Sequence, residues 1–139
     1  MRRILRPVLA VLAGLIAGSL VNMGLIVLGG QVIAPPAGAD LTTAEGLKAS
    51  MHLFAPRHFL FPFLAHALGT LAGALVATAL TPARTTGPAL VVGGLFLLGG
   101  IINAFMLPAP VWFIALDLAV AYLPAAWLGH RLVAGRGRA

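Results

Sequence analysis

Four long apolar runs alternate with short polar segments along the whole chain. The runs cover residues 7–33, 59–80, 89–107 and 111–130, and three of the four contain no formally charged side chain. A helix with a rise of about 1.5 Å per residue needs about 20 residues to cross the ~30 Å hydrocarbon core of a bilayer. The pattern therefore predicts an all-α membrane protein, built as a bundle of four transmembrane helices.

The run 59–80 presents two different helical faces. Leucines recur on one face and small residues on the other, at Leu64, Leu68, Leu71 and Leu75 and at Ala65, Gly69, Gly73 and Ala77. Lipid tails are as apolar as leucine, so membrane helices associate through close backbone approach at small residues. We therefore expect the leucine face to meet lipid and the small-residue face to meet the other helices.

The longest polar segment, residues 31–57, predicts a turn followed by a short helix. Prolines at 35 and 36 and the glycine at 38 break the first helix. Thr42 and Glu45 have the spacing of a capping box, which makes Thr42 the expected N-cap. Apolar side chains recur on one face of residues 42–54 and polar ones on the other. We expect an amphipathic helix here, lying on the membrane surface in the first outer loop.

Composition strengthens the membrane interpretation. The 139 residues are 60% hydrophobic and 9% charged, whereas about a quarter of the residues of a soluble domain are charged. We therefore expect a single integral membrane domain over residues 1–139, with the lipid bilayer as its first partner. The net charge of +6 does not indicate nucleic-acid binding, because the basic residues flank apolar runs and form no patch with interleaved aromatics.

The basic residues also predict the orientation in the membrane. Four spans place both termini on one side, which then holds seven arginines: Arg2, Arg3, Arg6, Arg84, Arg131, Arg136 and Arg138. The other side holds only Lys48 and Arg57. Short cytoplasmic flanks carry an excess of Lys and Arg, so the distribution favours an N-in, C-in topology with residues 31–57 outside.

Each predicted span carries one strongly polar side chain near its centre, on the small-residue face: Asn22, His66, Asn103 and Asp117. We infer a polar layer inside the bundle, in which Thr70 and Pro124 support the site. An aspartate at a helix centre costs about 2.5–3.5 kcal/mol on insertion scales, which makes Asp117 the strongest functional candidate. We hypothesise a His66–Asp117 pair whose remaining hydrogen bonds the two asparagines satisfy. Pro124 frees one backbone carbonyl about one turn from Asp117.

Three functions are compatible with this layer. It could bind or pass a small solute, a proton or a lipid; it could belong to a structural or accessory protein and only fix helix packing; or it could serve a lipid-modifying enzyme. We favour a non-enzymatic role, because no recognised nucleophile, phosphate-binding or paired-carboxylate motif accompanies the layer. With no cysteine and with unsuitable spacing of His52, His58 and His66, we expect no metal site and no cofactor.

Four segments carry a resemblance: PPAGAD at 35–40, LAHALGTLAGA at 64–74, GGIINAFMLPAPVWF at 99–113 and YLPAAWLG at 122–129. In these the chain resembles a group of small bacterial four-span membrane proteins of unknown function. The resemblance implies one small four-helix domain and brings no activity or site residues. Separately, we expect a multi-pass protein of the bacterial inner membrane. The glycine pairs at 14 and 18 and at 69 and 73 exceed what one small bundle needs, which predicts a homo-oligomer.

Overall fold

A computed structural model describes residues 2–82 and 84–135, and over these residues the chain is helical, with no strand. The long helices are α1 (Arg2–Val32), α3 (Leu60–Leu80), α4 (Thr86–Met106) and the pair α5 (Val111–Val120) and α6 (Leu123–Ala134). Between α1 and α3 lie the short helix α2 (Ala44–Ser50) and two 3-10 helices, η1 (Met51–Leu53) and η2 (Pro56–Phe59).

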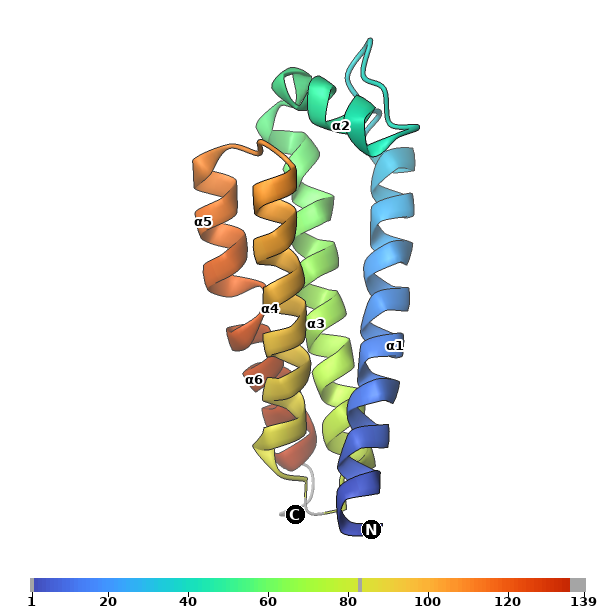
Figure 1. The fold of residues 1–139 in the computed structure, drawn as a ribbon, viewed down its shortest axis with the longest axis vertical. Helices are drawn as coiled ribbons and strands as arrows, with labels where there is room; N and C mark the ends of the chain where they lie inside the picture. Colours follow the sequence, from blue (N-terminus) through green and yellow to red (C-terminus); the bar gives the residue numbers. More distant parts are fainter. Residues whose placement is uncertain (1, 83, 136–139) are drawn as a thin grey trace.

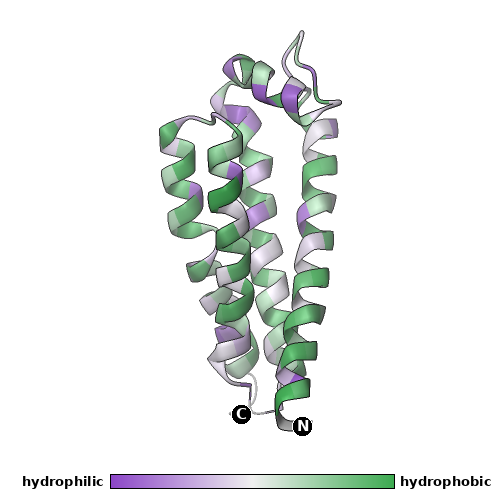
Figure 2. Ribbon diagram, in the orientation of Figure 1, coloured by the Kyte–Doolittle hydropathy of each residue, from purple (hydrophilic) through white to green (hydrophobic). Residues whose placement is uncertain are grey.

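The predicted set of four apolar helices is confirmed. Four helical segments, with α5 and α6 counted together, are long and apolar enough to cross a membrane. They stand side by side, with the start of α1 and the end of α6 at one end and α2 at the other (Figure 1). Hydrophobic residues cover these helices along most of their length (Figure 2). The orientation in a membrane stays a prediction, and two of its seven arginines, Arg136 and Arg138, lie outside the described residues.

Two helices begin several residues before their predicted starts, and each predicted start lies at or beside a proline. The third span was expected from residue 89, but α4 begins at Thr86 with Pro88 inside its first turn. The first span was expected from residue 7, but α1 already includes Arg2 and contains Pro7. Proline is tolerated in a first turn because that N–H has no intrahelical acceptor. At Pro7 the helix continues although one hydrogen bond is lost.

The fourth span is not the continuous helix that residues 111–130 predicted. It breaks at Ala121 and Tyr122, where the Tyr122 backbone leaves the helical region at φ −114° and ψ −83°. Pro124 follows in the first turn of α6, and its ring cannot fit against the carbonyl of Val120 in a continuous helix. The break therefore follows from Pro124. It turns Tyr122 toward the interior, where only 3% of the residue is exposed.

The small-residue face of α3 packs as expected. Ala65, Gly69, Gly73 and Ala77 are all buried. Alpha carbons without side chains let α1 lie directly on α3: a Cβ added at Gly18 would be 2.6 Å from the carbonyl oxygen of Gly69. A Cβ at Gly73 would be 2.7 Å from the carbonyl oxygen of Gly14. These four glycines are therefore used within one chain, so they no longer support the predicted homo-oligomer.

The segment before α2 is fixed by Asp40, and the cap of α2 differs from the prediction. Thr43, not Thr42, is the N-cap, and its hydroxyl accepts from the Gly46 amide at 2.9 Å. Thr42 is otherwise engaged, because its hydroxyl and amide both donate to Oδ1 of Asp40, at 2.6 and 2.9 Å. These two hydrogen bonds lower the pKa of Asp40 below its ordinary value, the hydroxyl having the larger effect. The amide of Asp40 donates in turn to Ser50 Oγ.

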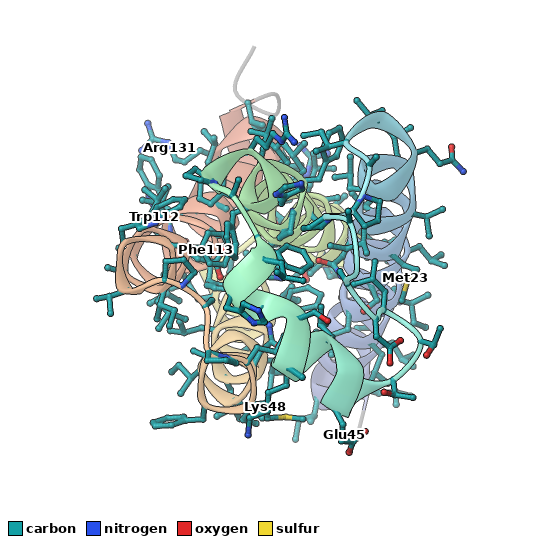
Figure 3. The ribbon with its side chains drawn as sticks, turned by 90° about the horizontal axis from the view of Figure 1, so that it is seen from above. Met23, Glu45, Lys48, Trp112, Phe113 and Arg131 are labelled. Carbon is teal, nitrogen blue, oxygen red and sulfur yellow. The ribbon has the colours of Figure 1, made fainter. Side chains whose placement is uncertain are left out.

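The apolar face of the short helix packs onto the bundle. Met51, Phe59 and Phe113 form a buried cluster, against which Leu47 and Phe54 pack from the α2 side. Seen from that end of the molecule, α2 lies across the bundle while Glu45 and Lys48 are at its periphery (Figure 3). The amphipathic segment predicted at 42–54 thus exists as α2 and η1, and its place at a membrane surface stays a prediction.

Candidate functional site

His66 of α3 and Asp117 of α5 are in direct contact, as hypothesised from the sequence. Nδ1 of His66 lies 2.9 Å from both carboxylate oxygens of Asp117. The Asp117 residue is 4% exposed, and the His66 side chain is 20% exposed. A carboxylate only accepts hydrogen bonds, so Nδ1 of His66 carries the proton and donates. This arrangement fixes the imidazole ring and leaves Nε2 as the atom that can meet a ligand.

Tyr122 is the second partner of Asp117, and sequence reasoning did not identify it. Its hydroxyl donates to Oδ2 of Asp117 at 2.9 Å. Its ring stacks on that of His66, with centroids 5.8 Å apart and planes inclined by 28°. Five residues separate Tyr122 from Asp117, a spacing that does not share a face in a continuous helix. The break caused by Pro124 brings them together, so the sequence signal was the proline beside the chain's single tyrosine.

The two asparagines do not satisfy the pair, which corrects the predicted hydrogen-bond network. Among the described residues neither Asn22 nor Asn103 bonds to His66 or Asp117, whose contacts are with each other and Tyr122. Asn103 is exposed and Asn22 half-buried, rather than packed inside the bundle. Both line cavities that His66 also lines. All four predicted residues therefore lie around one region of the bundle, but Asn22 and Asn103 border its cavities and do not bond to the pair.

An apolar cavity of about 370 Å³ lies between the four long helices, beneath α2. Ile26 of α1, Ala104 of α4 and Phe113 of α5 contribute to its walls, and Met51 and Phe54 cover it. His66, Asp117 and Asn103 supply polar groups at its deeper side. We call this space the chamber. Its volume falls in the range of about 300–1,000 Å³ that is usual for small-molecule sites.

A second, more polar cavity of about 320 Å³ lies on the other side of His66. It is lined by residues of α1, α3 and α4 and by the residue before α6: Ser19, Asn22, Ala65, His66, Gly69, Thr70, Phe96, Gly99, Gly100, Asn103 and Tyr122. Thr70 is 1% exposed, and its hydroxyl has no hydrogen-bond partner within the described part of the chain. That hydroxyl is too deeply buried to meet an occupant, so the polar groups on the cavity wall are those of Ser19, Asn22, His66 and Asn103. We call it the polar cavity.

The two cavities lie further along the bundle than the contacts of α1 with α4. In those contacts Gly14 faces Val92 and Gly18 faces Phe96 of α4. Beyond them, Ser19 and Asn22 of α1 line the polar cavity and Ile26 lines the chamber. His66, Gly100 and Asn103 line both spaces, so the pair sits where chamber and polar cavity meet.

The Tyr122 hydroxyl lies against Gly100, where there is no room for a side chain. A Cβ at Gly100 would overlap that hydroxyl, whereas a Cβ at Gly99 would meet nothing within 4 Å. We expect Gly100→Ala to lower the free energy of unfolding by about 1–3 kcal/mol, through overpacking and loss of the bond to Asp117. Gly99→Ala should instead be neutral or stabilising, because alanine favours the helix. Thermal unfolding in detergent compares the two, and equal stabilities would contradict the assigned role.

Neither a metal site nor a known family accounts for this site. Within residues 2–82 and 84–135, no three His, Cys, Asp or Glu side chains gather in a group that could hold a metal ion. No family model, no curated protein and no solved structure matches this chain.

Proposed function

We propose that the protein binds a small amphiphile from the bilayer, with the polar group of the ligand at His66 and its apolar body in the chamber. The observation that carries the proposal is that one oriented histidine stands at the boundary between an apolar and a polar space. A purely apolar ligand would leave Nε2 of His66 unused, and a fully polar one would not suit walls of Ile26, Phe113 and Leu118.

Asp117 supports this role by holding the imidazole ring. Because its carboxylate accepts from both His66 and Tyr122, the ring can neither flip nor turn without breaking hydrogen bonds in a mostly buried place. A fixed ring presents Nε2 to a ligand at little entropic cost, which is how preorganised groups gain affinity. This gives a reason for keeping an aspartate at a depth where insertion is unfavourable.

Passage of a small polar solute or a proton is the second candidate function. The polar cavity favours it, since Asn22 and Asn103 could replace part of the hydration of a solute beside His66. A lipid-modifying activity has less support, because no serine or threonine hydroxyl of the described residues bonds to His66. A purely structural role leaves the two cavities without a purpose.

The setting of this activity is proposed from the sequence. A multi-pass position in the bacterial inner membrane, an N-in, C-in topology and the surface position of α2 follow from the charge distribution and the resemblance to small four-span proteins. A homo-oligomer would have to use other glycines, such as Gly94 on α4, since those at 14, 18, 69 and 73 pack inside the chain.

Octanol is a suitable first probe, because its hydroxyl can donate to Nε2 of His66 and its chain can fill the chamber. We expect saturable binding to the protein in lipid nanodiscs, measured by calorimetry against empty nanodiscs. Ala104→Phe places a ring in the chamber and should weaken binding about tenfold or more, equivalent to about 1.4 kcal/mol. Ala115→Phe, on the exposed side of α5, is the matched control and should bind normally. Absence of saturable binding, or equal affinity in both variants, would overturn the proposal.

A further inference from the structure

Asp117 is the only acidic residue in the four apolar runs. The other two acidic residues of the chain, Asp40 and Glu45, lie in the polar segment between α1 and α3, and the four runs contain no lysine or arginine. Among the described residues the Asp117 carboxylate accepts from His66 and Tyr122, and no lysine or arginine pairs with it. The site therefore contains a buried negative charge that no lysine or arginine of the protein balances.

The neutral form of His66 satisfies every contact that its ring makes in the structure. The bond to Asp117 uses one proton, on Nδ1. A second proton, on Nε2, would need an acceptor, and no described residue offers one to that atom. Nε2 is not among the buried atoms without a partner, and the side chain is 20% exposed. Nε2 is therefore an accessible acceptor beside two cavities, and it calls for a ligand that donates.

The walls around His66 offer further acceptors and no fixed cation. Within the described part of the chain, no lysine or arginine lines the chamber or the polar cavity. Asn103 lines both spaces and Asn22 lines the polar cavity, and each has a side-chain oxygen that can accept. An ammonium group has three N–H donors and no acceptor, so it matches Nε2 of His66 and these two oxygens.

Aromatic rings and the low dielectric favour a positive head group in the same place. Phe96 and Tyr122 line the polar cavity, and Phe59 and Phe113 line the chamber. A cation close to the face of such a ring is attracted by the ring quadrupole. Attraction between a cation and Asp117 is also stronger away from water, where charges are screened less. An anionic head group would be repelled by Asp117 for the same reason.

We propose that the ligand is a protonated amine on an apolar chain. Its ammonium group donates to Nε2 of His66 and balances the charge of Asp117, while the chain occupies the chamber. This inference rests on the proposed function and names the chemical class of the ligand. Free amphiphilic amines and the head group of phosphatidylethanolamine share this chemistry, because both present a primary ammonium group.

Octylammonium is the probe, and octanol and octanoate have a chain of the same length with a neutral or a negative head. The protein is held in phosphatidylcholine nanodiscs, whose head groups have no N–H donor, and empty nanodiscs give the concentration of each probe in the bilayer. Wild type should bind octylammonium about tenfold more tightly than octanol, and octanoate more weakly than octanol. Octyltrimethylammonium has the charge but no N–H, so it should bind more weakly than octylammonium.

Asp117→Asn removes the charge and keeps an oxygen that can accept from His66. The ratio of the octylammonium and octanol affinities should fall about tenfold, to near one. The ratio is the readout because any change in the position of the ring affects both probes. Glu45→Gln is the matched control, since it removes the same charge from an exposed position on α2 and should keep the wild-type ratio. If Asp117→Asn does not fold, the comparison of head groups in wild type still decides.

Equal affinity of wild type for octanol and octylammonium, or an unchanged ratio in Asp117→Asn, would overturn this inference and leave the proposed function standing. Equal affinity for the two cations would overturn the hydrogen bond to His66. Absence of saturable binding for every probe would overturn the proposed function instead. Replacing part of the lipid by phosphatidylethanolamine identifies the source of the amine: weaker octylammonium binding indicates the lipid head group, and unchanged binding indicates a free amine.

Discussion

Gly18→Ala is expected to lower the free energy of unfolding by about 1–3 kcal/mol, the usual cost of overpacking. The added Cβ would lie 2.6 Å from the carbonyl oxygen of Gly69 and 2.8 Å from the ring of Phe96. The ring can turn aside, but the carbonyl belongs to the backbone of α3 and moves only if the two helices separate. The separation would also affect the facing contact between Gly14 and Gly73, so the effect should be large for one methyl group.

Gly24→Ala is the matched control for this change, in the same helix and two turns away. Its Cβ would meet nothing within 4 Å, so only the helix preference of alanine acts, which favours the variant by about 1 kcal/mol. Unfolding with denaturing detergent at fixed micelle concentration compares the two variants with wild type. If Gly18→Ala were as stable as Gly24→Ala, the close contact of α1 and α3 would be wrong.

The packing of α1 on α3 could be predicted because small residues at regular spacing in a membrane helix indicate close approach of another helix. The spacing of Gly69 and Gly73 on α3 identified the buried face, and the structure places Gly14 and Gly18 against it. What the spacing could not show is that the facing pair lies in the same chain. The spacing predicts an oligomer as readily as close packing within one chain, because a motif of glycines fits a second copy and a second helix equally well.

Contacts in the site could be predicted only for the side chains that are most unfavourable inside a membrane. Asp117 and His66 had few alternatives to each other inside the bundle, and they do form a pair. Asparagine is cheaper to leave at a cavity wall, and Asn22 and Asn103 lie there instead of completing the network. The contact of Tyr122 with Asp117 depends on a helix break, and such a break does not follow from residue spacing.

His66→Phe is expected to lower the free energy of unfolding by about 3 kcal/mol, because it removes a hydrogen-bond donor from a buried charged carboxylate. Phenylalanine keeps a ring to stack on Tyr122, so the loss comes from leaving Asp117 with only the Tyr122 hydroxyl as donor. Asp117→Leu should cost about 1–3 kcal/mol, because it orphans Nδ1 of His66 and that hydroxyl but removes a charge that is unfavourable in a membrane.

The double variant, His66→Phe with Asp117→Leu, should be more stable than His66→Phe alone. Replacing both partners of a buried hydrogen bond by apolar side chains of the same shape can be nearly neutral, and here one unpaired hydroxyl remains. A double-mutant cycle measured by thermal unfolding in detergent gives the coupling free energy directly. Additive effects would mean that the contact at 2.9 Å carries no net coupling. A near-neutral double variant would mean that folding does not need the pair, and that its retention beside two cavities is explained by a bound ligand.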